Sequence, residues 1–174
     1  MLSSDRKRVF WRRLLGVAGL SLLAIAGGCQ VRPLYATDEV TATALKSVAF
    51  SDADDRVELE VRNQLIFMAA GGAGEPANPE YDVELNVKER NVGVLLEVSS
   101  DTPRAGRIVL VADFTLKRRS TGEVLKTGRR STVALVDFSQ QEFAKIRATR
   151  DAENRAAREL AELIRADIAS WLGR

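Results

Sequence analysis

The chain contains no histidine and only one cysteine among its 174 residues. A lone cysteine cannot form an internal disulfide, and zinc sites built from Cys and His ligands are excluded by counting. Histidine is the commonest general base, and without it neither a Ser-His nor a Cys-His nucleophile pair can exist. These absences weigh heavily against a hydrolase.

Other signatures of chemistry are also missing. The sequence has no phosphate-binding loop, no Rossmann glycine pattern and no metal-ligand spacing. The acidic cluster at 52–60 lacks the spacing of a calcium-binding loop. Aspartates before an apolar periodic segment are typical of a helix N-terminus. We therefore predict no catalytic residue, no metal and no cofactor.

No apolar run reaches the roughly 20 residues that a transmembrane helix needs. The longest, residues 14–27, follows a basic segment at 5–13, which is the pattern of a secretory signal. Small residues then precede Cys29, as in a bacterial lipobox, although Ala26 stands where Leu is usual. We expect cleavage after residue 28 and a lipid anchor on Cys29. An ordinary signal peptide or an uncleaved anchor, with a chance cysteine, is the alternative.

The net charge of +2 comes from this first segment, which holds five of the 26 basic residues but only one of the 24 acidic residues. Residues 29–174 therefore carry 21 basic and 23 acidic residues, a net charge of −2. A nucleic-acid partner is not indicated.

Hydrophobic periodicity divides the remaining chain into a tether at 29–44 and a single domain at 45–174. Period-2 alternation predicts strands, and apolar residues at helical spacing predict two helices. Ser139 and Glu142 match a capping box, and Phe138 and Phe143 match a hydrophobic staple, at the start of the second helix. A polar stretch at 147–155 indicates either a kink or a partly exposed first half of that helix. In chain order, we expect a strand at 45–50, a helix at 55–70, a strand at 81–88 that could extend to 98, strands at 107–117 and 123–135, and a helix ending at Leu172.

This order indicates an α+β domain in which two helices pack on one face of a four-stranded, mostly antiparallel sheet. The turn Ser120-Thr121-Gly122 joins two of the strands as a hairpin.

Basic residues are concentrated between residues 104 and 147, where ten face only four acidic residues. Guanidinium groups bind phosphate in a bidentate manner, so such a cluster suits an anionic, phosphorylated ligand. A charged, soluble sheet edge that resists aggregation is the competing interpretation. The candidate ligand contacts are Arg118, Arg119, Arg129 and Arg130.

Three segments resemble the alphaproteobacterial form of the LptE family of lipopolysaccharide-assembly lipoproteins. They are CQVRPLYA at 29–36, RNQLIFMAAGGAGEPANPEYDVELNV at 62–87 and RDAENRAARELAELIRADIASWL at 150–172. The first has Gln30 and Val31 where the family usually has Gly and Phe.

The resemblance implies an outer-membrane lipoprotein without enzymatic activity that plugs the β-barrel LptD, supports its assembly and binds lipopolysaccharide. It also implies the same two-layer fold. Two other functions compete: a lipoprotein that binds another anionic lipid or peptidoglycan without a barrel partner, and a lipid-anchored hydrolase, which the missing histidine disfavours.

Overall fold

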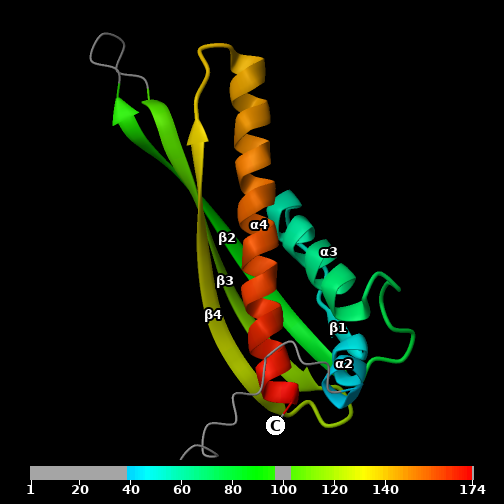
Figure 1. Cartoon of the computed structure of the whole chain (residues 1–174). Coiled ribbons are helices and arrows are strands. Elements are labelled where there is room, and N and C mark those ends of the chain that lie inside the picture. The colour runs from blue at the N-terminus through cyan, green and yellow to red at the C-terminus, as the bar shows by residue number, and fades with distance from the viewer. Residues whose placement is uncertain (1–38, 97–102, 174) are drawn as a thin grey trace, which may run out of the picture. The chain divides into compact units, whose positions relative to one another are not determined.

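A computed structural model of the chain describes residues 39–96 and 103–173 (Figure 1). The predicted signal peptide, Cys29, the tether up to residue 38 and residues 97–102, which include the end of the possible strand extension to 98, lie outside the described residues. The described residues all belong to one structural unit, Thr37–Arg174.

The unit contains three helices and four strands among its described residues. In chain order they are α2 (Glu39–Lys46), β1 (Val48–Phe50), α3 (Arg56–Ala70), β2 (Tyr81–Leu96), β3 (Pro103–Arg118), β4 (Val124–Asp137) and α4 (Glu142–Leu172).

The strands form one sheet in the order β1-β2-β3-β4. The short strand β1 runs parallel to β2, whereas β2 pairs with β3, and β3 with β4, in antiparallel orientation. The turn between β3 and β4 contains Gly122 in the left-handed region, with φ 69°, as a hairpin turn requires. The predicted mixed, mostly antiparallel sheet and its hairpin are therefore confirmed.

The core lies between the sheet and the helices α3 and α4, which cover one of its faces (Figure 1). Alternate residues of each strand face this layer, because successive side chains in a strand point to opposite sides. α4 contributes a stripe of small and branched residues, and its alanines let the helix lie close to the sheet. The largest fully buried side chains are Leu65, Ile108, Leu110, Leu116, Leu160, Ile164, Ile168, Val61 and Val83.

The start and end of α3 follow the sequence prediction. Asp55 is the N-cap, and its side chain accepts a hydrogen bond from the backbone N–H of Glu58 at 2.9 Å. Gly71 ends the helix with φ 62°, and its N–H donates to the carbonyl of Phe67. The acidic segment before the helix therefore caps it.

The described residues contain a third helix, α2, where the sequence predicted a tether and the first residues of a strand. α2 packs against α3 and α4, and Leu45 at its end is 6% exposed. The first strand is accordingly shorter than predicted and begins at Val48. β2 continues to Leu96, within the extension that the sequence allowed, with register shifts after Gly93. β3 is longer than predicted and begins at Pro103.

The predicted capping box of α4 is wrong. The helix begins one residue after Gln141, which is the N-cap and makes no side-chain capping bond. Ser139 Oγ instead accepts from the N–H of Gln141 at 3.2 Å. The staple is also wrong, because Phe143 is 71% exposed while Phe138 packs against the core. α4 runs without interruption for 31 residues, so the polar stretch marks a partly exposed first half and not a kink.

Candidate functional site

The four predicted arginines do not share one surface. The guanidinium of Arg118 lies 5.7 Å from the ring centroid of the buried Tyr81, on the helix-covered side of the sheet. Arg130 also faces that side, because it bonds to Asp167 of α4. Arg119 and Arg129 pair instead with side chains of the opposite, open face. The cluster seen in the sequence is thus divided between two faces.

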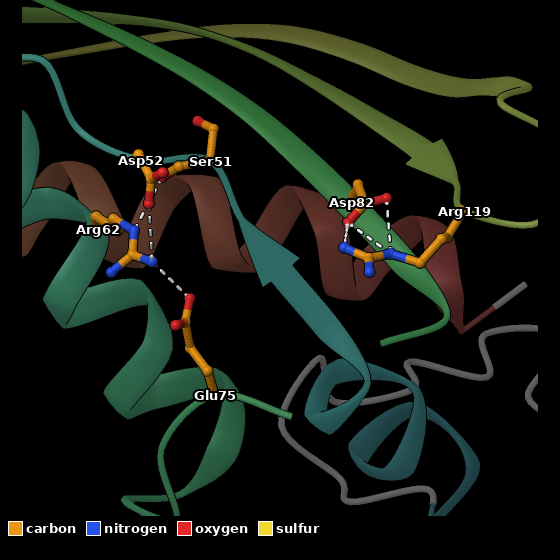
Figure 2. Close-up of polar contacts among 6 residues, drawn as sticks. All are labelled: Ser51, Asp52, Arg62, Glu75, Asp82 and Arg119. Atoms are coloured by element: carbon orange, nitrogen blue, oxygen red, sulfur yellow. Dashed lines mark hydrogen bonds and ion pairs between the residues drawn. The ribbon is translucent and has the colours of Figure 1, made fainter. Parts of the chain in front are cut away.

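Each of these arginines is also paired with a carboxylate. Arg119 binds Asp82 through Nε and Nη2, at 2.5 to 3.1 Å (Figure 2). Arg130 donates to Asp167 at 2.6 Å. These hydrogen bonds raise the pKa of both guanidinium groups above its ordinary value. The other two contacts are longer, at 3.6 Å each: Arg118 with Glu80 and Arg129 with Asp113.

The open face therefore carries ion pairs across its strands and little uncompensated charge near the hairpin. Lys117 of β3 also contacts Glu84 of β2 at 2.5 Å. A hollow of about 600 Å³ lies on this face between Glu84, Asp113 and Arg129. Exposed ion pairs contribute little to stability, so an incoming anion could compete for Arg119 or Arg129 at modest cost.

A second cationic surface, which sequence reasoning missed, lies on the first half of α4. It consists of Phe143, Ile146, Arg147 and Arg150, and we call it the α4 outer face. Phe143 and Ile146 are 71% and 51% exposed. These residues border a hollow of about 450 Å³. Their i, i+3, i+4, i+7 spacing, in line with the core stripe of α4, was the signal that could have revealed them.

Polar side chains also connect α3 to the segment after β1 and to β2 (Figure 2). Arg62 of α3 donates to the carbonyl of Ser51 at 2.9 Å and to Glu75 at 2.7 Å. Ser51 Oγ and Glu58 Oε2 each accept a backbone N–H of β2, from Leu85 and Val87 respectively, at 3.0 Å. Because these polar groups satisfy one another's hydrogen-bonding capacity, we assign this region a structural role.

Within residues 39–96 and 103–173, no three acidic or cysteine side chains are grouped as metal ligands. None of the described helices is both long and apolar enough to cross a membrane.

Comparison with solved structures finds the same fold. A Caulobacter crescentus protein is 25% identical, with a TM-score of 0.66 over 76% of this chain and 96% of its own. Rare lipoprotein B from Shewanella oneidensis is 12% identical, with a TM-score of 0.54 over 71% of this chain and 92% of its own. A minor lipoprotein from Acinetobacter baumannii is 13% identical, with a TM-score of 0.50 over 71% and 88%.

No curated protein matches the sequence. The sequence model of the LptE family, described as lipopolysaccharide-assembly, matches residues 43–168. That match begins within α2 and ends in the last turns of α4, so it covers the whole sheet and both long helices. The chain therefore belongs to the LptE family of lipopolysaccharide-assembly proteins.

Proposed function

We propose that this protein is a lipoprotein of the outer membrane, without enzymatic activity, that binds lipopolysaccharide and supports and plugs an LptD-like β-barrel. The observation that carries the proposal is the family match across the fold, together with the lipobox-like segment that ends at Cys29. The residue after the cysteine is Gln30 and not an aspartate, and this fits delivery of the lipoprotein to the outer membrane.

The open face of the sheet suits the wall of such a barrel. The interior of outer-membrane barrels is polar. Three ion pairs cross this face, each joining a basic side chain of β3, β4 or their hairpin to a carboxylate of β2 or β3. Val133 and Leu135 of β4 lie beyond them, 51% and 70% exposed, and would give the contact an apolar part. The paired charges can face a polar wall without leaving a lone charge desolvated.

A pull-down from native membranes in a gentle detergent tests the barrel partner. We expect the lipoprotein to co-purify with an outer-membrane barrel of much larger mass, identified by mass spectrometry. If no barrel is recovered, while the lipoprotein still binds an anionic lipid or peptidoglycan, the barrel proposal is wrong.

For lipopolysaccharide, Arg118, Arg119, Arg129 and Arg130 remain the proposed contacts. Replacing them with Glu would place like charges beside Asp82 and Asp167 and would destabilise the fold. Replacement of all four with Gln is the cleaner test. We expect this variant to keep its helical circular dichroism and to bind immobilised lipopolysaccharide more weakly; unchanged binding would remove these residues from the proposal.

A further inference from the structure

The α4 outer face has an unusual composition for a surface that nothing covers in the described part of the chain. Phe143 and Ile146 are large apolar side chains, and both are mostly exposed. Phe143 and Ile146 lie 18 residues before the buried Ala161 and Ile164, and at about 100° per residue each pair points in the same direction. The outer face therefore continues the direction of the core stripe past the stretch of α4 that α3 covers, and its apolar side chains stay exposed (Figure 1).

Its cations differ from the four predicted arginines. Neither Arg147 nor Arg150 forms an ion pair with another described residue. The carboxylate that borders the hollow, Asp151, is held by Arg155 at 2.9 Å. Asn154, also in the lining, accepts a hydrogen bond from Arg56 of α3 at 3.0 Å. Two positive charges thus remain available beside the apolar side chains.

The side chains of the α4 outer face are partly ordered and border an open hollow. The guanidinium of Arg147 lies 5.8 Å from the ring centroid of Phe143, a cation–π arrangement that restricts the side chain. α3 lies beside α4 only beyond the first turns of α4 (Figure 1). The hollow of about 450 Å³ lies on this uncovered stretch.

We propose that the α4 outer face binds one molecule of an anionic amphiphile, with Arg147 and Arg150 holding a phosphate and Phe143 and Ile146 contacting an acyl chain. Guanidinium groups match phosphate geometry, and burying the exposed apolar side chains against an acyl chain is favourable. The inference rests on the proposed function and places a lipopolysaccharide contact where the sequence analysis placed none.

The surface also lies far from the entry of the chain. Thr41 of α2 neighbours Gly173, just beyond the end of α4. A 31-residue helix is roughly 45 Å long, so the start of α4 lies about that far from α2. Glu39 lies ten positions after Cys29, and a chain of ten residue steps can span at most about 35 Å. The outer face thus lies at the end of α4 that is distant from Glu39, and binding to vesicles must be compared with binding to the free amphiphile.

The test compares three variants of the full chain, purified in mild detergent, for binding to immobilised lipopolysaccharide with and without its lipid A phosphates. R147Q/R150Q removes the charges, and F143S/I146S removes the apolar contacts. R158Q/L163S is the matched control, with the same types of change farther along α4. We expect each outer-face variant to bind at least about tenfold more weakly, with the control unchanged.

Removing the phosphates should weaken binding by the wild type more than binding by R147Q/R150Q, because the variant has already lost the contact between a phosphate and these two arginines. If the wild type binds but both outer-face variants bind equally well, this inference is wrong and the proposed function stands. If the wild type does not bind, both are wrong. Equal loss of binding to phosphatidylglycerol vesicles would identify the outer face as a bilayer contact and would also overturn the inference.

Discussion

Among the described residues, Glu58 is the only charged side chain in the core, where it is 2% exposed. Burial raises the pKa of its carboxyl group, and the nearby Asp54 and Asp55 add to the rise, while the hydrogen bond from Val87 opposes it. The folded protein therefore holds this proton more tightly than the unfolded chain does.

We predict that the free energy of unfolding falls as pH rises from about 4.5 through the raised pKa of Glu58, because the folded state there binds more protons. The E58Q variant keeps an acceptor for Val87 and should lose much of this pH dependence. The E58A variant should lose about 1–3 kcal/mol at any pH, because it leaves the N–H of Val87 without an acceptor. Urea unfolding between pH 4 and 7 measures both effects; an unchanged slope in E58Q would contradict the assignment.

Residue identity predicted the caps of α3 but not the environment of the arginines. Asp55 and Gly71 act within one turn of the helix, so their neighbours in sequence suffice. The carboxylates that pair with Arg119 and Arg130 are each 37 residues distant in sequence. A count of the charges in a local stretch of sequence does not include these distant carboxylates. It therefore overestimated the positive potential near the hairpin.

At the scale of elements, α2 is the main departure from the sequence analysis. Eight residues give a weak periodic signal, and an isolated helix of this length is marginal in water. Tertiary contacts with α3 and α4 stabilise it instead. The start of α4 was misplaced for a related reason, because a capping motif at Ser139 competed with a start two residues later that no side chain caps. The strands with period-2 alternation were correctly predicted to be strands, because their pattern alone indicates this structure.

We predict that L45A destabilises the protein by about 2–4 kcal/mol, because Leu45 is buried where α2 meets the core. V40A, on the same helix but at a position that is 75% exposed, should change the free energy of unfolding by less than about 0.5 kcal/mol. Thermal or urea denaturation distinguishes them. Equal, small effects would mean that residues 39–46 behave as the tether that the sequence indicated.

At the scale of the whole molecule, the lipid anchor determines where the domain works. We predict that the wild type carries acyl chains on a mature N-terminus at Cys29 and that C29S lacks both this acyl mass and the cleavage after residue 28. The net charge of residues 29–174 is slightly negative and gives no net electrostatic attraction to an anionic membrane, so the lipid and not the charge would hold the mature domain there. A26L, which restores the usual lipobox residue, should be processed normally. A wild-type protein that keeps its first 28 residues and carries no acyl mass would support a signal anchor instead.

The hydrogen bonds at the outer edge of β2 have a consequence for how the chain folds. The amides of Leu85 and Val87 point away from β3 and are satisfied by side chains 34 and 29 residues earlier, on the segment after β1 and on α3. Hydrogen exchange at these two amides should therefore report the docking of α3 and not the pairing of β2 with β3. The strand pairs β2–β3 and β3–β4 can form first. The amides at this edge of β2 become protected from hydrogen exchange only when the N-terminal third of the domain has packed against the edge.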